Sequence, residues 1–319
     1  MKEKISIVIP CYNEEPMIEL FYKEMSNVSK NGLKTYDFEY IFVNDGSSDR
    51  TLEIMRKLSV QNPSEVRYLS FSRNFGKEAA LYAGLKAASG DFIVVMDVDL
   101  QDPPSLLPEM INLLKSDDYD CVGTRRTTRV GEPPIRSFFA KQFYKLINRI
   151  TDIEIVDGAR DYRIMTRQMT DSVLSVSEYN RFSKGIFSWV GYNTTYINYE
   201  NVERMAGKTN WSFWGLFKYS LDGIVSFSEV PLSISSFIGL FSFIVSILMA
   251  IFFTVRTVLF NNPTEGWTSL MVVILGLGGI QLFSIGILGK YVGKMFLEAK
   301  KRPLFVIKEQ SGTGDETNE

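Results

Sequence analysis

The arrangement of hydrophobic residues divides the chain into two parts. Up to about residue 200, short apolar runs of strand length alternate with longer segments of helical periodicity. Alternation at this spacing is typical of βαβ units, so it predicts an α/β domain with a mostly parallel sheet. The predicted strands are residues 5–10, 36–43, 66–71, 91–96 and 118–123, and the clearest helical segments are residues 16–29 and 77–88.

The last third of the chain has a different pattern. Residues 232–260 are almost wholly apolar, and Arg256 is the only charged residue among them. Residues 267–289 are apolar and uncharged. Each run exceeds the ~20 residues that a helix needs to cross the hydrocarbon core. We therefore expect a hairpin of two transmembrane helices, with a short turn at residues 261–266 between them.

Apart from Arg256, the basic residues of this region lie outside the hairpin. Five follow the second run and three precede the first, while the turn itself carries none. The positive-inside rule then places both termini and the α/β domain in the cytoplasm, as in a multi-pass protein of the inner or plasma membrane. The flanking residues are Arg204, Lys208, Lys218, Lys290, Lys294, Lys300, Lys301 and Arg302.

Three further segments have mixed patterns. Residues 211–219 are rich in Trp, Phe and Tyr and favour a position along a bilayer surface, although a buried aromatic helix gives the same composition. Residues 138–150 show a helical apolar stripe with flanking cations, which suits either a core helix or a membrane-surface helix. The polar, acidic segment 309–319 is expected to be disordered.

Composition limits the chemistry. The formal net charge of -2 gives no indication of nucleic-acid binding. The two cysteines, Cys11 and Cys121, stand far apart, which is typical of a reducing compartment and not of a disulfide framework. The chain contains no histidine, so a Ser-His triad, a His-ligated zinc site and an imidazole base are excluded. Any catalysis must use carboxylates, Arg, Lys, backbone amides or a metal.

Polar clusters follow three of the predicted strands, at residues 10–14, 44–49 and 97–101. Ligands of parallel sheets bind at the carboxyl ends of strands, so the three clusters should meet at one edge. Asp97 and Asp99 are spaced so that both side chains can reach one ion, and hard oxygen ligands suit Mg²⁺ or Mn²⁺. An acidic turn after a core strand is the alternative for such a short motif.

Four segments together resemble the motifs of a known family, the inverting family-2 glycosyltransferases with a GT-A fold. Within that family they are most similar to the polyprenyl-phosphate branch, which includes dolichyl-phosphate mannose synthases. The two-span hairpin looks like that of bacterial undecaprenyl-phosphate glucosyltransferases that decorate cell-wall glycan or O-antigen. The resemblance covers nearly all of residues 5–300, and its motifs are Pro10-Cys11-Tyr12-Asn13-Glu14, Val43-Asn44-Asp45-Gly46-Ser47-Ser48-Asp49, Arg73-Asn74-Phe75-Gly76-Lys77 and Asp97-Val98-Asp99-Leu100-Gln101.

The resemblance implies roles for particular residues. A bound Mg²⁺ or Mn²⁺ ion is expected on Asp97, Asp99 and Gln101. Asp161, Asp99 and Asp157 are the expected catalytic carboxylates. Asp161 matches the family's base or acceptor-orienting Asp, but a swap with Asp157 stays open. The nucleotide-sugar would contact Pro10, Tyr12, Glu14, Asp45, Lys77 and Asp97, and the acceptor phosphate would contact Arg125, Arg136 and Arg163, with Arg129 a weaker candidate and a solvated surface arginine the alternative for each.

The expected activity is transfer of a single hexose, with glucose favoured, from a UDP-sugar to undecaprenyl phosphate. One alternative is a processive polysaccharide synthase, but the Gln-x-x-Arg-Trp motif of such enzymes is absent where Asn180-Arg181-Phe182 stands. Another is a non-catalytic nucleotide-sugar-binding subunit. Candidate partners are a second copy of the chain, a flippase and an extracytoplasmic glycosyltransferase. The expected parts are a GT-A domain at 1–200, an amphipathic interface segment at 201–230, transmembrane helices at 231–260 and 267–290, and a basic then acidic tail at 291–319.

Overall fold

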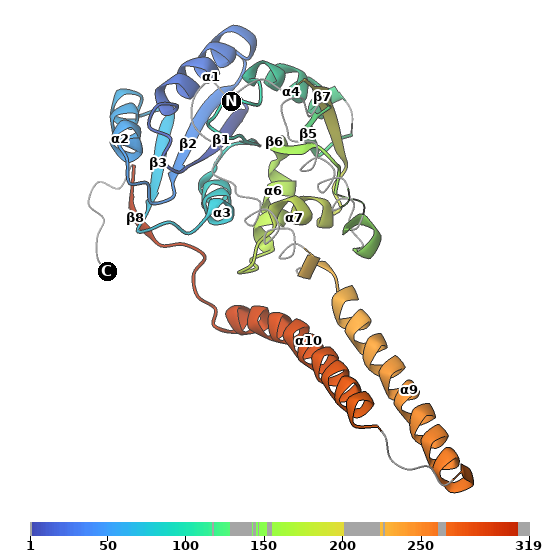
Figure 1. The fold of residues 1–319 in the computed structure, drawn as a ribbon. Helices are drawn as coiled ribbons and strands as arrows, with labels where there is room; N and C mark the ends of the chain where they lie inside the picture. The colour runs from blue at the N-terminus through green and yellow to red at the C-terminus, as the bar shows by residue number, and fades with distance from the viewer. Residues whose placement is uncertain are drawn as a thin grey trace. The chain divides into compact units, whose positions relative to one another are not determined.

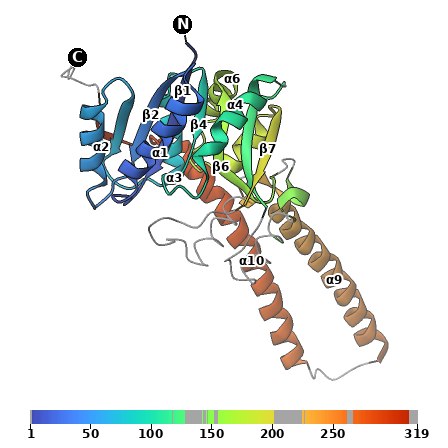
Figure 2. The ribbon, with the colours of Figure 1, turned by 90° about the horizontal axis from the view of Figure 1, so that it is seen from above.

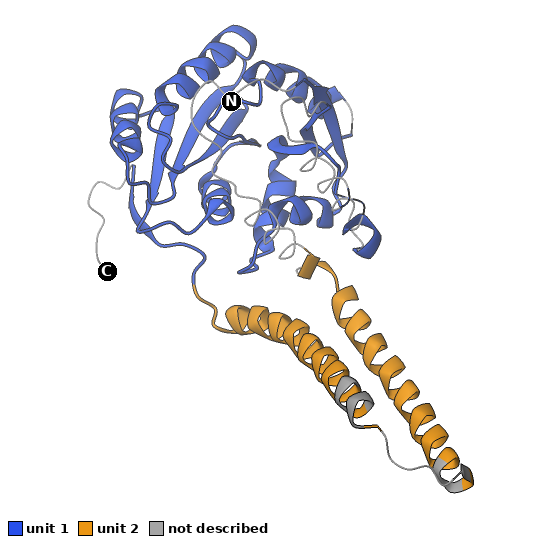
Figure 3. Ribbon diagram, in the orientation of Figure 1, with its two compact units in different colours: residues 1–220, 303–319 blue, residues 221–302 orange. Residues whose placement is uncertain are grey.

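The structure is a computed structural model, and its chain forms two compact units. One unit comprises Met1–Ser220 with Pro303–Glu319, and the other comprises Leu221–Arg302 (Figure 3). Each unit is described here by itself. The residues that the structure describes are 2–116, 118–127, 142, 145, 147–151, 155–200, 224–225, 227–260 and 266–311.

The first unit is built on an eight-stranded sheet with the order β7-β5-β6-β4-β1-β2-β3-β8 (Figure 1). Strands β1 to β4 run parallel, whereas β6 is antiparallel to both β4 and β5, and β8 is antiparallel to β3. This confirms the predicted α/β fold with a mostly parallel sheet. The strands are β1 Lys4–Cys11, β2 Asp37–Asn44, β3 Val66–Phe71, β4 Phe92–Val95, β5 Cys121–Arg126, β6 Ala159–Thr166, β7 Thr194–Tyr199 and β8 Ile307–Gln310.

Side chains of β1 alternate between the two faces of the sheet, as the strand period requires. Ile5, Ile7 and Ile9 belong to one buried cluster with residues of α1, α2 and α4. Val8 points to the opposite face, where α3 approaches so closely that a Cβ on Gly84 would lie 2.2 Å from a Val8 methyl carbon. The helices of this unit are α1 Ile18–Gly32, α2 Thr51–Gln61, α3 Lys77–Ala87, the short 3₁₀ helix η1 Pro104–Leu106, α4 Leu107–Ser116, α6 Arg167–Ser175 and α7 Ser183–Trp189.

The topological switch point lies between β1 and β4. The chain runs from β1 to β2 on one side, and β4 pairs with β1 on the other. A crevice for ligands is expected outside the carboxyl ends of strands at such a point. Because β6 runs antiparallel to β4 with Val95 opposite Arg163, the first residues of β6 lie at this same edge.

β6 begins at Ala159, within a run of polar residues, because pairing with both β4 and β5 outweighs its polar composition. One local prediction was wrong. The segment from Glu309 onward was expected to be disordered, yet β8 pairs there with β3 and Ser311 donates its backbone N–H to the Tyr68 carbonyl. Residues 312–319 lie outside the described part of the chain.

The second unit is a pair of helices, α9 Val230–Phe260 and α10 Trp267–Ala299, which lie side by side in both views (Figures 1 and 2). By length and composition both can cross a membrane, over Val230–Arg256 and Val273–Ala299, which indicates membrane association. Helix α10 continues past the predicted end at residue 290, because the basic residues there are good helix formers. Much of the predicted helical segment 138–150, residues 201–223 of the predicted interface segment 201–230 and most of the turn lie outside the described residues.

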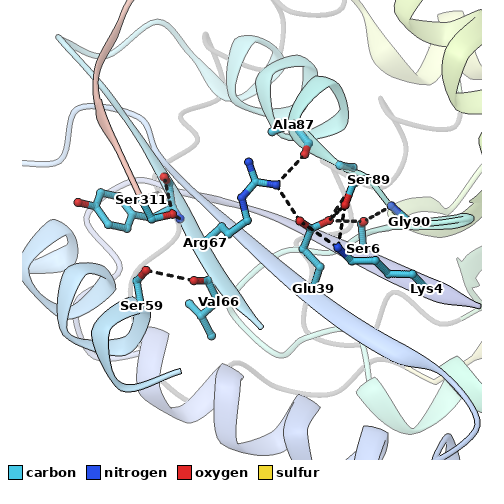
Figure 4. Close-up of polar contacts among 12 residues, drawn as sticks. Lys4, Ser6, Glu39, Ser59, Val66, Arg67, Ala87, Ser89, Gly90 and Ser311 are labelled. Carbon is cyan, nitrogen blue, oxygen red and sulfur yellow. Dashed lines mark hydrogen bonds and ion pairs between the residues drawn. The ribbon is translucent and has the colours of Figure 1, made fainter. Parts of the chain in front are cut away.

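A buried carboxylate joins three strands of the first unit near the amino end of the parallel sheet (Figure 4). Glu39 on β2 accepts hydrogen bonds from Ser6 at 2.7 Å, from Arg67 at 2.7 Å and from Ser89 at 3.0 Å, and lies 3.5 Å from the Lys4 ammonium. Burial alone would raise the pKa of Glu39, but these hydrogen bonds hold it at about 2. The cluster links β1, β2 and β3 at the end of these strands opposite the switch point.

Candidate active site

The loops that follow β1 and β2 are joined by hydrogen bonds. Asn13, at a φ of 54°, accepts a hydrogen bond from the Ser48 backbone N–H at 2.8 Å and donates its own N–H to Ser47 Oγ at 2.9 Å. The Glu14 N–H donates to Thr51 Oγ1 at 2.9 Å. These hydrogen bonds hold the two loops together. Tyr12 is 42% exposed at the carboxyl edge of the sheet, where a ligand can reach its ring. Nucleotide contacts of Pro10, Tyr12 and Glu14 stay a prediction.

Asp45 fixes the loop between β3 and α3. Its carboxylate is buried and accepts the backbone N–H of Phe75 at 2.6 Å and of Gly76 at 2.9 Å. The next residue, Gly46, has a φ of +67°, and a Cβ there would lie 2.4 Å from the carbonyl carbon of Arg73. Burial raises the pKa of Asp45, although the two N–H groups oppose the shift. We expected Asp45 to contact the nucleotide; here both oxygens hold the backbone just before Lys77.

Lys77 connects two carboxylates at the switch point. Its ammonium lies 2.6 Å from Asp97 Oδ1, just beyond β4, and 2.5 Å from Asp161 Oδ2 on β6. Burial disfavours the charged ammonium, but Asp161 and Asp97 together raise the pKa of Lys77. Burial likewise opposes ionisation of Asp161, but the charges of Lys77 and then Lys184 hold the pKa of Asp161 well below its usual range. The ammonium and the Asp161 carboxylate are therefore both charged at neutral pH.

The turn after β4 carries side-chain oxygens of the kind that bind metal ions. Asp97 is partly exposed, with 25% of its side chain open to solvent, whereas Asp99 is buried and accepts the Gln101 N–H at 3.2 Å. Within the described residues, no group of three or more acidic, His or Cys side chains converges to hold an ion. The side-chain oxygens of Asp97, Asp99 and Gln101 are of the kind that suits a divalent cation with further ligands from phosphate oxygens, the usual arrangement for Mg²⁺.

A buried ion pair joins this turn to β6, and sequence reasoning missed it. Asp102 is 1% exposed and accepts hydrogen bonds from Arg160 Nε at 3.0 Å and from the Tyr199 hydroxyl. Arg160 also reaches Gln101 Oε1 at 3.4 Å. Burial raises the pKa of Asp102, and the Arg160 charge opposes that shift. The sequence shows only that Asp102 follows Gln101 and that Arg160 precedes Asp161, and no local pattern indicates that these two charges form a pair.

Two of the predicted phosphate-binding arginines have different surroundings. Arg125, at the end of β5, is exposed and donates from Nε to the Asp157 carbonyl at 2.9 Å. Arg163 is 3% exposed, donates to the Arg160 carbonyl at 3.1 Å and stacks 3.9 Å from the Phe187 ring. Arg125 can thus meet a ligand from solvent, whereas Arg163 supports the backbone of β6. Arg136 and Arg129 lie outside the described residues.

Lys184 was not predicted. It stands in the first turn of α7, and its ammonium donates to the Ala159 carbonyl at 3.3 Å. Its charge contributes to the low pKa of Asp161, so it belongs to the same charged cluster. Of the two candidate carboxylates, Asp161 contacts Lys77, and the Asp157 backbone carbonyl accepts a hydrogen bond from Arg125. No sequence motif marks Lys184, since α7 comes to the site only through the fold.

An α/β domain with an ammonium and carboxylates gathered at its switch point has the arrangement of a protein that binds a ligand at the carboxyl ends of its strands. The model of glycosyl transferase family 2 matches residues 6–174, and the chain belongs to this family. It is a glycosyltransferase.

Relatives match almost the whole chain. It is 42% identical over 307 residues to the bactoprenol glucosyl transferase of Shigella phage SfV, with 96% of this chain and 99% of the relative covered. It is 43% identical over 305 residues to the prophage bactoprenol glucosyl transferase homolog of Escherichia coli K12, with 96% and 98% covered. Among solved structures, glucosyl-3-phosphoglycerate synthase from Mycobacterium tuberculosis, in complex with Mn²⁺, UDP-glucose and phosphoglyceric acid, matches at a TM-score of 0.46 and 21% identity, over 70% of this chain and 78% of that chain.

Proposed function

We propose that this glycosyltransferase transfers one glucose residue from UDP-glucose to undecaprenyl phosphate (bactoprenol), with inversion at the sugar C1. The observation that carries this proposal is full-length similarity: relatives named bactoprenol glucosyl transferase match both the α/β unit and the two-helix unit. A lipid phosphate is an acceptor that an enzyme with two membrane-crossing helices can reach without leaving the bilayer.

On the donor side, the exposed Tyr12 ring can pack on the uracil base, and Asp97 and Asp99 with Gln101 would hold a Mg²⁺ or Mn²⁺ ion. When bound, such an ion would stabilise negative charge on the departing diphosphate. The Lys77 ammonium adds a fixed positive charge at the same edge. This leaving-group assistance needs no protonated acid, in keeping with a chain that has no histidine.

On the acceptor side, a phosphate monoester has a second pKa of ~6 and is already largely a dianion at neutral pH. The exposed Arg125 and the half-buried Lys184 are placed to attract it. Asp161 has a pKa below its usual range, so it is a weak base. We therefore assign Asp161 the role of orienting Lys77 and the acceptor, and not of removing a proton.

The two helices would anchor the enzyme with its α/β unit and both termini in the cytoplasm, following the distribution of basic residues. The sugar-lipid product would then require a flippase and an extracytoplasmic glycosyltransferase. A cysteine introduced as Thr264→Cys should react with an impermeant maleimide on intact cells, whereas Lys2→Cys should react only after permeabilisation. Both native cysteines are buried, which keeps the background low. The reverse labelling pattern would contradict this orientation.

The activity test uses the purified full-length chain in detergent with Mg²⁺, radiolabelled UDP-glucose and undecaprenyl phosphate. We expect one labelled lipid that carries a single hexose by mass spectrometry. The variant Asp161→Asn should lower turnover by on the order of a hundredfold, while Asp157→Asn serves as the comparison and should retain most activity. A ladder of longer products would indicate a processive synthase, and binding of UDP-glucose without turnover would indicate a non-catalytic subunit.

A further inference from the structure

The segment that follows α10 is attached firmly to the edge of the sheet. β8 pairs with β3, the Ser72 N–H donates to the Val306 carbonyl at 3.0 Å, and the Tyr68 N–H donates to Ser311 Oγ at 2.8 Å. Glu309 accepts both Arg56 Nε at 2.8 Å and the adjacent guanidinium nitrogen at 2.6 Å, in a bidentate pair. Residues 303–311 are called the C-terminal strap below.

Residues 72–76, between β3 and α3, form the catalytic loop, and Phe305 of the strap contacts one aromatic ring on each side of it. Phe305 stacks on Phe71 with ring centroids 5.0 Å apart and planes 14° apart, and its ring lies 6.4 Å from that of Tyr82. Phe71 ends β3 and Tyr82 lies on α3, so these two residues bracket the loop that leads to Lys77. Phe71 also meets the Phe75 ring edge-on at 5.7 Å.

The loop between them has a second fixed point. Asp45 holds the N–H groups of Phe75 and Gly76, and Gly76 has a φ of +98°, a flexible position directly before Lys77. With Asp45 on one side and Phe305 on the other, the start of α3 is held in register with β4 and β6. In this register the Lys77 ammonium contacts both Asp97 and Asp161.

We infer that Phe305 is a positioning residue for Lys77, and that the strap makes the catalytic loop depend on the chain beyond the membrane helices. This rests on the proposed function for its turnover readout. A misplacement of about 1 Å at a charged catalytic group can lower turnover a hundredfold without weakening ground-state binding equally. The effect of losing Phe305 should therefore appear in kcat and in the local protection of the loop.

The test compares Phe305→Ala with the matched variant Val306→Ala in the full-length protein. Val306 lies in the same strap, but its side chain is 47% exposed. We expect Phe305→Ala to speed backbone hydrogen exchange of residues 72–80 by about tenfold and to lower kcat by about tenfold. The KM for UDP-glucose should stay within about twofold. Phe305→Tyr should restore both exchange and kcat, and Val306→Ala should change neither.

Three results would overturn the inference: unchanged exchange at residues 72–80, faster exchange spread evenly over the whole unit, or local loosening without loss of kcat. The exchange measurement needs no substrate. If the unaltered protein itself failed to transfer glucose, the proposed function would fall, and exchange at residues 72–80 would still decide whether Phe305 holds the loop.

Discussion

At the scale of single residues, the site depends on one ammonium shared between two carboxylates. The Lys77 ammonium lies 2.6 Å from Asp97, which follows β4, and 2.5 Å from Asp161, which lies on β6. Its charge lies against both carboxylates and keeps the pKa of Asp161 low. Its loss should therefore alter both the rate and its pH dependence.

The variant Lys77→Met should lower glucose transfer by on the order of a hundredfold at neutral pH. Without the ammonium the pKa of Asp161 should rise, because burial then acts with less opposition. The remaining activity should accordingly fall off at a higher pH on the acid side than in the unaltered enzyme. Lys86→Met, an exposed lysine on the same helix, is the control and should leave the pH–rate profile unchanged. A profile that Lys77→Met does not shift would contradict this role.

The sequence predicted which residue types would gather but not which side chains would be open. Asp97 follows the parallel strand β4, as strand-end reasoning expects. Lys77 and Asp161 were predicted from the family resemblance, and Asp161 reaches the same edge because β6 runs antiparallel to β4. Arg163 was expected to bind phosphate, but the alternation of β6 points it inward onto Phe187. Lys184 was missed, because short helix α7 carries no motif that ties it to a strand end.

At the scale of elements, the turn after β4 is joined to β6 by the Asp102–Arg160 pair. The pair is buried on the Asp102 side and accepts a further hydrogen bond from Tyr199 on β7. It thus links the turn that carries Asp99, the strand β6 that carries Asp161, and strand β7. Removing one partner of a buried pair costs more than the pair contributes, because the other charge is left without compensation.

We expect Asp102→Asn to lower the free energy of unfolding by about 3 kcal/mol, while Tyr199→Phe, which removes one hydrogen bond to the same oxygen, should cost about 1 kcal/mol. Urea unfolding of the full-length protein in detergent, followed by circular dichroism, measures both. Equal losses for the two variants would mean that the ion pair contributes no more than the hydroxyl.

Local periodicity found the strands with a strong apolar run and missed those with polar residues, such as β8. β3 has the predicted limits, Val66–Phe71, because its apolar alternation is strong. β8 carries polar residues on an exposed edge, and its partner lies more than two hundred residues earlier in the chain. Composition alone cannot reveal such a pairing, so a disordered tail was the natural prediction.

At the scale of the whole molecule, one contribution to stability lies at the opposite end of the sheet from the candidate active site. The switch point lies at the carboxyl ends of β1 and β4, whereas the Glu39 cluster lies near the amino end of the parallel strands. Glu39 has a pKa of about 2, below its ordinary value of 4.5. A carboxyl group with a lowered pKa stabilises the fold above its ordinary pKa and loses that contribution as the pH falls toward the lowered value.

Glu39→Gln should therefore destabilise the protein by about 3 kcal/mol at pH 7, and the difference from the unaltered protein should shrink between about pH 4.5 and pH 2. Chemical unfolding at a series of pH values measures this. The exposed Glu24→Gln is a suitable control and should show no comparable difference. A destabilisation that stays constant down to pH 2 would show that packing, and not charge, explains the loss.

The late position of β8 has a consequence for biosynthesis. Tyr68 and its partner Ser311 are 243 residues apart, and at about 5–20 residues per second a ribosome needs on the order of ten to fifty seconds to translate that interval. During this time β3 is a bare edge, open to pairing with other nascent chains. Completion of the sheet must wait until both apolar helices have left the ribosome, so a chain truncated by premature termination keeps its sheet unfinished.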